Sequence, residues 1–455
     1  MRALLLNPPS RADGKYVSRD QSATGVVEER FVPSEIFLTA AYLQDRGHEA
    51  DVVDLNGGEL DLTAFQVAVV WVSVLHSFHR DVDWLRRAKE AGCRTVMVLN
   101  EAYAGFEAGT LQRRPYIDAA VRLWERQLSL AALLDSWRTD TRPQFPGLIV
   151  RDGDTFLDTG EHPRCTDLSH LVSCAPLLRQ WPLDSYQAVG ITPGRGCTAR
   201  HRFCRYSRTT QGKRKLEHVV GEIEAVADRV PRILLLDPDL PSNRRWTEEL
   251  CRELIDRRLP ITWRADMRPE QADPELLRLY RASGCTEAMM AVQTLDPEVA
   301  RQLRAGQSPE LVRRALRAFR GVGIKPILFF YIGWPWDSAQ SLCKIEQFLR
   351  EEPVASFYLK QVRPWPGTTV YADFRRLGLM ERELQVEDFV ESGSPLCASL
   401  HLSLEELEDW KERIGRSGIL NPGYVWHFFR ERRLRPKHVR QFLALVRGRN
   451  IFAGQ

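Results

Sequence analysis

The sequence predicts a mixed α/β protein with two parallel-sheet units and a helical C-terminal region. Three observations lead to this fold class. Strand-like and helix-like segments alternate in two separate stretches of the 455-residue chain. The strand-like segments are short, continuous apolar runs, which are typical of parallel strands covered on both faces. A segment without sustained periodicity separates the two stretches, and a chain of this length has room for about two to four domains.

Residues 1–150 are expected to form a doubly wound, Rossmann-like domain. The segments that we expect to be its strands and helices follow one another along the chain in this order: Leu4–Leu6, Pro33–Arg46 (helix), Ala50–Asp54, Gln66–Val72, Arg80–Ala91 (helix) and Arg94–Leu99. Such a fold does not by itself identify a ligand.

Residues 151–187 are expected to be a linker, because they are rich in proline and show no period. Residues 188–373 predict a (βα)6 partial TIM barrel, whose chemistry would lie at the C-terminal ends of its strands. Its six strand-like runs are Ala188–Thr192, Arg232–Asp237, Ile261–Ala265, Glu287–Val292, Pro326–Tyr331 and Ser356–Gln361. Residues 374–455 are helical and charged in pattern, and we expect them to cap the barrel.

Composition and charge exclude several classes of protein. Hydrophobic residues make up 44% and charged residues 27%, which excludes a disordered chain. The net charge of +4 argues against a nucleic-acid partner. The apolar runs Val67–Val74 and Pro326–Trp334 are shorter than the ~18 residues that span a bilayer, and Ala3–Leu6 is shorter than a secretory signal. Nine cysteines suit a reducing compartment, so we expect a cytoplasmic protein without a membrane partner.

A segment with metal-ligand spacing follows the first strand of the second unit. Cys197, His201 and Cys204 lie within eight residues. Thiolates suit iron–sulfur clusters or zinc, and imidazole can replace a thiolate. The alternatives are a zinc site, which lacks a nearby fourth ligand, and a basic loop with two incidental cysteines. Arginines in the same loop are expected to lower the thiol pKa values: Arg195, Arg200, Arg202 and Arg205.

The segment Gly194-Arg-Gly-Cys-x3-His-x-Phe-Cys204 resembles the signature of radical S-adenosylmethionine (SAM) enzymes. This resemblance implies that Cys197, His201 and Cys204 hold a 4Fe-4S cluster that binds SAM, and that Phe203 lies near the adenine. His201 stands where the family has its second cysteine. It is either a histidine ligand, which would raise the cluster potential, or a change that abolishes activity.

Later segments resemble the same family in the same order. They are Ile233–Asp239, Glu275–Cys285, Ala291–Asp296, Tyr331–Asp337 and Pro364–Thr368. The resemblance extends over about residues 188–372 and implies SAM contacts from three side chains at strand ends, namely Asp237, Arg264 and Gln293.

The first domain resembles the cobalamin-binding domain that precedes one class of these enzymes. The matching segments include Ser34–His48, and Ser73-Val-Leu75 corresponds to an element that contacts the nucleotide tail of the cofactor. Two features depart from the pattern. The chain has no Asp-x-His-x-x-Gly motif, and Leu99-Asn100 replaces a pair of glycines whose absence would crowd the groove. The alternative is a domain that keeps the fold without the ligand.

The resemblance implies a cobalamin-dependent radical SAM enzyme that methylates an unactivated carbon of a small metabolite. It also implies an external one-electron reductant of flavodoxin or ferredoxin type. Two alternatives stay open at this point: a radical cyclisation or rearrangement without methyl transfer, and a degenerate family member that acts as a binding partner.

Overall fold

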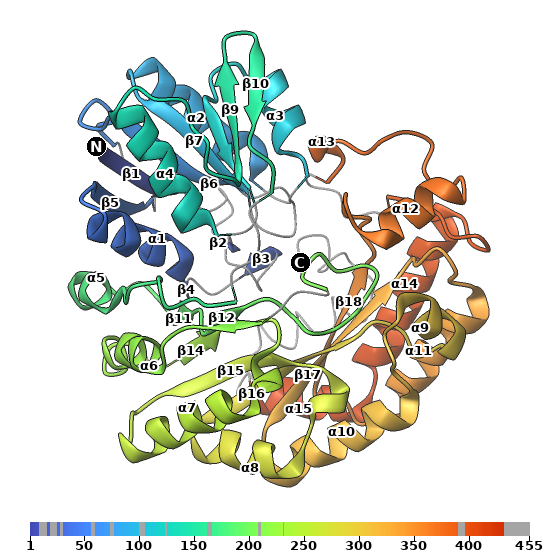
Figure 1. The fold of residues 1–455 in the computed structure, drawn as a ribbon. Coiled ribbons are helices and arrows are strands. Elements are labelled where there is room, and N and C mark those ends of the chain that lie inside the picture. The colour runs from blue at the N-terminus through green and yellow to red at the C-terminus, as the bar shows by residue number, and fades with distance from the viewer. Residues whose placement is uncertain are drawn as a thin grey trace.

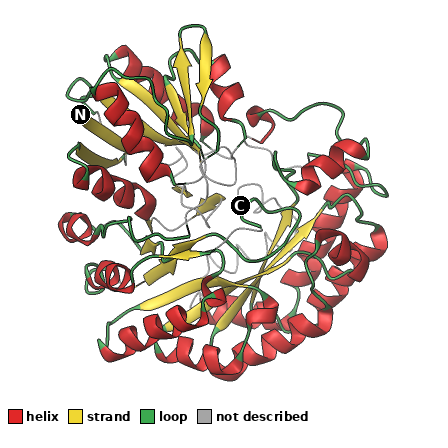
Figure 2. Ribbon diagram, in the orientation of Figure 1, coloured by secondary structure: helices red, strands yellow, loops and turns green. Residues whose placement is uncertain are grey.

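The computed structural model describes residues 1–8, 16–18, 25–27, 31–55, 60–72, 77–99, 105–122, 125–161, 166–207, 211–230, 232–389 and 396–431. Two seven-stranded sheets form two lobes, one N-terminal and one built from the rest of the chain (Figure 1). Helices lie on both faces of the first sheet and on the outer face of the second (Figure 2). None of the helices in the described part is long and apolar enough to cross a membrane.

The first sheet is doubly wound. Its strand order is β10-β9-β8-β7-β6-β1-β5. Helices α1 and α4 pack on one face, and α2 and α3 on the other. The parallel strands are β5 (Glu49–Asp54), β1 (Arg2–Asn7), β6 (Val67–Val72), β7 (Arg94–Leu99) and β8 (Ala119–Val121); β9 (Leu148–Asp152) and β10 (Thr155–Asp158) are antiparallel. The helices are α1 (Ser34–Asp45), α2 (Phe78–Glu90), α3 (Glu107–Arg113) and α4 (Arg126–Arg138).

The second sheet is an open, parallel partial barrel. Its strands pair in chain order, and a two-residue strand from the N-terminal region, β4, pairs with β11 at one edge. The strands are β4 (Phe31–Val32), β11 (Ala188–Ile191), β14 (Arg232–Leu235), β15 (Thr262–Met267), β16 (Cys285–Val292), β17 (Lys325–Ile332) and β18 (Ser356–Gln361). The predicted fold class, a doubly wound domain followed by a partial βα barrel, is confirmed.

Helices and short elements connect these strands. Several helices begin after a residue whose side chain accepts a hydrogen bond from the first turn: Asn243, Asp273, Asp296, Ser308 and Ser338. The connecting elements are β12 (Gly194–Arg195), β13 (Gly212–Lys213), α6 (Leu216–Glu224), η2 (Leu240–Ser242), α7 (Arg244–Asp256), η3 (Pro269–Gln271), α8 (Pro274–Ala282), α9 (Pro297–Leu303), α10 (Pro309–Val322) and α11 (Ala339–Glu351).

The segments expected to be a linker and a cap contain regular elements. Strands β9 and β10 extend the first sheet to Asp158, and α5 (Ala175–Gln180) follows. Helix α14 packs along α11 and beside the edge strand β18. The remaining elements are a small antiparallel pair, β2 (Tyr16–Ser18) and β3 (Gly25–Val27), and the helices α12 (Thr369–Arg376), α13 (Val386–Phe389), α14 (Leu404–Ile419) and α15 (Pro422–Glu431).

Candidate cluster and cofactor site

The motif loop leaves the C-terminal end of β11 through a tight β12–β13 pairing. A Cβ atom on Gly194 would lie 2.5 Å from the carbonyl oxygen of Gly212 and 2.7 Å from Oδ2 of Asp237. Only glycine permits this close approach. The pairing therefore fixes where the loop starts and delivers Cys197 to the end of the barrel strands.

Asp239, which follows β14, holds the motif loop in place. Its Oδ2 accepts hydrogen bonds from the backbone N–H of Thr198 at 2.8 Å and from its hydroxyl at 2.7 Å. Its Oδ1 accepts from Arg268 at 2.6 Å and from Gln271 at 2.7 Å. Burial alone would raise the pKa of Asp239, but Arg268 and the donated hydrogen bonds outweigh it and hold the pKa below its usual value.

Cys197 is a buried thiol that faces one arginine. Nη1 of Arg268 lies 3.6 Å from its Sγ. Burial, reinforced by the charge of Asp239, raises the pKa of Cys197 to about 12, although Arg268 opposes this shift. The expectation that the loop arginines lower the thiol pKa is therefore wrong for Cys197. Binding a metal would require this thiol to lose its proton, and Arg268 is placed to stabilise the resulting thiolate.

Three of the four loop arginines, namely Arg195, Arg202 and Arg205, bind acceptors of their own. Nη2 of Arg195 donates to Glu35 of the first lobe at 2.9 Å. Nη2 of Arg202 donates to Oδ2 of Asp373 at 2.6 Å. Arg205 donates to the carbonyl oxygen of Pro366 at 2.5 Å. These side chains anchor the loop to both lobes.

His201 is suited to act as a neutral metal ligand. Its ring stacks on Phe203 with centroids 5.0 Å apart. The ring centroid of Phe203 in turn lies 5.0 Å from that of Trp334. Burial and the charge of Arg268 lower the pKa of His201 to about 4, so the imidazole is uncharged at neutral pH and keeps a free lone pair.

No single-ion site is formed among the described residues. No three His, Cys, Asp or Glu side chains there lie close enough together to hold one metal ion. The ligands of a four-iron cluster bind different irons and so stand further apart than the ligands of one ion. Two thiols and a neutral imidazole suit such a cluster chemically, and the ligand roles of Cys197, His201 and Cys204 stay predictions.

Of the predicted SAM contacts, Asp237 and Gln293 follow the C-terminal ends of β14 and β16, whereas Arg264, expected at a strand end, lies inside β15 in register with Glu287. Asp237 is fully buried and forms an ion pair with Nζ of Lys213 at 2.6 Å. Gln293 is 3% exposed, and its Oε1 accepts no hydrogen bond from the described residues. The backbone carbonyl oxygen of Gln293 accepts a hydrogen bond from the indole N–H of Trp334 at 3.1 Å. Arg264 is half-buried on β15, and its role also stays a prediction.

Sequence reasoning missed several residues of this site. Asp239 and Arg268 fix the loop, and Lys213 occupies one oxygen of Asp237. One signal was available for the arginine: Arg268 continues the alternation of Arg264 and Asp266 one residue past the end of β15. Asp239 had no such signal, because a loop residue has no period.

Part of the predicted cobalamin site falls outside the described residues, namely Ser73, Leu75 and Asn100. Leu99 ends β7 with its side chain buried in the core beside Phe106 and Leu111.

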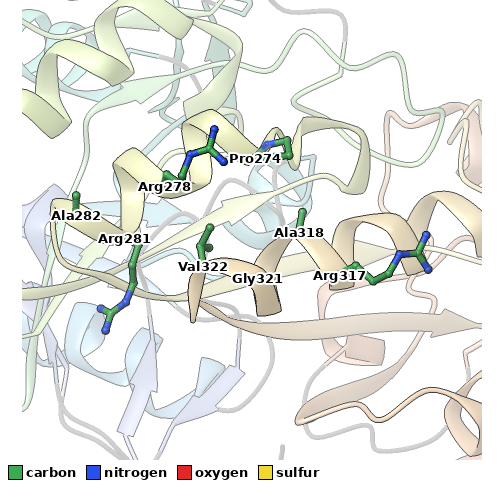
Figure 3. A pocket seen from close by; sticks show the side chains of 8 residues that line it. All are labelled: Pro274, Arg278, Arg281, Ala282, Arg317, Ala318, Gly321 and Val322. Atoms are coloured by element: carbon green, nitrogen blue, oxygen red, sulfur yellow. The ribbon is translucent and has the colours of Figure 1, made fainter.

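A groove of about 460 Å³ lies away from this site, between α8 and α10 (Figure 3). Arg278 and Arg281 come from α8 and Arg317 from α10, and their guanidinium groups point in different directions. Because they do not converge on one point, we assign no ligand to this groove.

Comparison with known proteins agrees with this geometry. Residues 191–349 match the family model described as the radical SAM superfamily. An uncharacterised methyltransferase of Pyrococcus horikoshii is 21% identical over 394 residues, which cover 82% of each chain. The anaerobic magnesium-protoporphyrin IX monomethyl ester cyclase of Rubrivivax gelatinosus is 24% identical over 473 residues, covering 96% of this chain and 81% of the cyclase.

Two solved structures share the fold of both lobes. The radical SAM methyltransferase TsrM from Kitasatospora setae, solved with cobalamin and a 4Fe-4S cluster, has a TM-score of 0.66 at 17% identity, covering 84% of this chain and 76% of TsrM. The cobalamin-dependent SAM radical enzyme OxsB, solved with aqua-cobalamin and SAM, has a TM-score of 0.65 at 10% identity, covering 100% of this chain and 72% of OxsB. Residues 191–349 thus match a radical SAM domain, and the overall fold of the chain is that of TsrM and OxsB.

Proposed function

We propose that this chain is a cobalamin-dependent radical SAM enzyme that methylates an unactivated carbon of a small metabolite. The observation that carries the proposal is the pairing of a doubly wound lobe with a radical SAM domain whose motif loop, Cys197 to Cys204, follows the first barrel strand. TsrM and OxsB have this pairing and were solved with cobalamin, and TsrM is a methyltransferase.

The donor set fits the implied cofactors. Cys197, His201 and Cys204 would hold a 4Fe-4S cluster, and Ser73 and Leu75 would contact cobalamin. When bound, the cluster supplies one low-potential electron to SAM, and cobalamin supplies a methyl group. The neutral imidazole of His201 and the guanidinium that faces Cys197 support this ligand set.

Other side chains of the barrel would bind and orient SAM. Oε1 of Gln293 is buried and receives no hydrogen bond from the part of the chain that the structure describes, so it can accept one from a hydroxyl or ammonium group of SAM. Phe203 and Trp334 form an aromatic pair against which the adenine can pack. Asp237 would share its carboxylate between Lys213 and the ammonium of SAM, and Arg264 would bind the SAM carboxylate.

A one-electron reductant and a reducing compartment complete the proposal. We infer a flavodoxin- or ferredoxin-type donor, because the proposed reaction consumes an electron that the substrate does not provide. We place the protein in the cytoplasm, where thiols such as Cys197 stay reduced.

A radical cyclisation is the second candidate, since the cyclase of Rubrivivax gelatinosus aligns with 96% of this chain. Such an enzyme would cleave SAM without transferring a methyl group. The two candidates therefore differ in their products.

One assay tests the radical chemistry without knowledge of the substrate. The full-length protein, reconstituted anaerobically with iron, sulfide and hydroxocobalamin, should release 5′-deoxyadenosine from SAM when reduced with dithionite. Retention of a corrinoid after gel filtration would favour methyl transfer, whereas deoxyadenosine formation by a corrinoid-free protein would favour cyclisation. A protein that takes up neither cluster nor corrinoid would contradict both.

A further inference from the structure

Arg268 lies outside the motif loop but faces a predicted cluster ligand. It is the first residue after β15, and its Nη1 donates a hydrogen bond to Sγ of Cys197 at 3.6 Å. The arginine is largely buried beside the thiol, with 15% of its side chain exposed. Because a guanidinium does not lose its proton in a protein, Arg268 stays a donor to this sulfur at any working pH.

Two carboxylates hold the guanidinium in this place. Its Nε donates to Oε1 of Glu270 at 2.7 Å, and its Nη1 donates to Oδ1 of Asp239 at 2.6 Å. The two hydrogens of Nη1 are thus divided between Asp239 and Cys197. The backbone N–H of Arg268 donates to Oε1 of Gln271 at 2.9 Å. Because the side chain is already ordered, directing its N–H at sulfur costs little further conformational entropy.

A hydrogen bond to a ligand sulfur changes how readily an iron–sulfur cluster accepts an electron. Reduction adds negative charge, part of which falls on the sulfurs, so a donor there stabilises the reduced form more than the oxidised form. Glu270 and Asp239 offset much of the positive charge of Arg268, which leaves the short-range N–H to act on Cys197. His201 acts in the same direction, because a neutral imidazole in place of a thiolate makes the ligand set less negative.

We propose that Arg268 is a positioning residue of the 4Fe-4S site, which donates a hydrogen bond to the Cys197 thiolate and raises the reduction potential of the cluster. This inference rests on the proposed function, because it requires the cluster. It adds a residue that lies 71 positions from Cys197 and outside the motif. The structural alternative is that Arg268 only anchors Asp239 and, through it, the motif loop.

The midpoint potential of the cluster distinguishes these two roles. The full-length protein and its variants are reconstituted anaerobically with iron and sulfide and titrated with dithionite in the presence of mediators, and the EPR signal of the reduced cluster is followed. Arg268→Met should shift the midpoint to a more negative value. We expect the ratio of oxidised to reduced cluster at the wild-type midpoint to rise about tenfold, which corresponds to about 59 mV for one electron. Arg268→Lys, which keeps one donor group, should recover part of this shift.

Gln271→Met is the matched control. Nε2 of Gln271 donates to the same oxygen of Asp239 at 2.7 Å, so its loss weakens the anchor of the loop and keeps the donor to sulfur. This variant should have the wild-type midpoint potential, even if it unfolds at a lower urea concentration. Equal midpoint potentials for Arg268→Met and wild type would overturn the proposal. An equal negative shift in Gln271→Met would also overturn it, since weakening the anchor would then be sufficient.

A second measurement does not depend on the stability of Arg268→Met. The wild-type protein is grown with arginine that carries heavy nitrogen in its guanidinium group, and the reduced cluster is studied by pulsed EPR. The cluster should show a magnetic coupling to this nitrogen, and Arg268→Lys should hold the cluster without the coupling. Absence of the coupling in wild type would overturn the proposal even if Arg268→Met takes up too little iron for a titration.

The outcomes also separate the role of Arg268 from the proposed function. A cluster potential that depends on Arg268, in a protein that makes no 5′-deoxyadenosine, would contradict the function and leave the role of Arg268 standing. Deoxyadenosine formation with a potential that does not depend on Arg268 would contradict that role alone. A protein that takes up no cluster would contradict both.

Discussion

His201 is the residue on which the proposed metal chemistry most directly depends. Its imidazole is neutral and lies in the motif loop between two cysteines. We expect His201→Ala to lose most of its iron, because the two remaining thiols leave two of the four irons without a protein ligand instead of one. His201→Cys should keep or gain iron, since it restores the donor set of the family. Iron and sulfide per chain, measured after anaerobic reconstitution, check this.

Cys343→Ala is the control for this experiment, since Cys343 is an exposed thiol on α11. It should bind as much iron as wild type. Equal iron content in His201→Ala, His201→Cys and wild type would contradict a ligand role for His201.

Asp266 gives a pH-dependent prediction. Burial raises its pKa from 3.8 to about 7, with Asp237 adding to the shift and Arg264 opposing it, and no described residue donates a hydrogen bond to it. The folded carboxyl keeps its proton up to about pH 7, whereas the unfolded one loses it near pH 3.8. Stability should therefore fall as the pH rises through this window. We expect a fall of about 2 kcal/mol, which is smaller than the full pKa difference implies because water still reaches the side chain.

Asp266→Asn should remove this loss and be more stable than wild type at pH 8 but not at pH 4, as measured by urea unfolding. Asp337 is the contrast, because burial also raises its pKa to about 7 while it accepts hydrogen bonds from the backbone N–H groups of Gly333 at 2.9 Å and Trp334 at 3.0 Å. Asp337→Ala should destabilise by about 2 kcal/mol. A stability of Asp266→Asn that runs parallel to wild type between pH 4 and 8 would contradict the assigned shift.

The motif residues could be predicted from the sequence because a ligand spacing is local. The arginine that faces Cys197 could not be predicted in this way. Arg268 is separated from it by 71 positions, and only the fold brings their side chains together. The same holds for Asp239 and Thr198, which are 41 positions apart.

Among the elements, α14 has the clearest structural role, since it packs along the edge strand of the second sheet. Its Gly418 faces Phe357 of β18 so closely that a Cβ atom would lie 2.4 Å from the ring. Gly418→Val should push the helix off the strand, lower the melting temperature and expose a strand edge that promotes aggregation. Light scattering during thermal unfolding measures both effects.

Gly415→Ala on the same helix is the matched control. A Cβ atom there meets nothing within 4 Å. This variant should be as stable as wild type or slightly more so, because alanine favours a helix more than glycine does. Equal melting temperatures for Gly418→Val and wild type would show that α14 does not protect the strand edge.

Elements with long apolar runs matched their predicted places, and those that depend on a distant partner did not. The strand expected at Gln66–Val72 is β6, which begins one residue later and is buried throughout, because a continuous apolar run decides a buried strand by itself. Strand β4 was not predicted. It has only two residues, and its place at the β11 edge is set by pairing with residues far along the chain.

At the scale of the whole molecule, a buried polar network joins the two lobes at the motif loop. Arg195 donates to Glu35 at 2.9 Å and to Gln127 at 2.9 Å, and its Nη1 lies 3.3 Å from Glu125. Thr192 donates to the other oxygen of Glu35 at 3.1 Å. Burial alone would raise the pKa of Glu35. The charges of Arg195 and Arg126 outweigh this effect and lower the pKa below its usual value, so the carboxylate stays charged. The lobes are thus joined through a residue of the motif itself.

This network predicts how the lobes depend on Arg195. Arg195→Met removes a cation from between two buried carboxylates, and we expect a loss of about 3–5 kcal/mol in the free energy of unfolding. Arg195→Met combined with Glu35→Gln should recover part of that loss, because one buried charge then disappears with its partner. Urea unfolding followed by tryptophan fluorescence measures both. If Arg195→Met unfolds at the same urea concentration as wild type, the lobes are held together by apolar contacts and the network only sets their orientation.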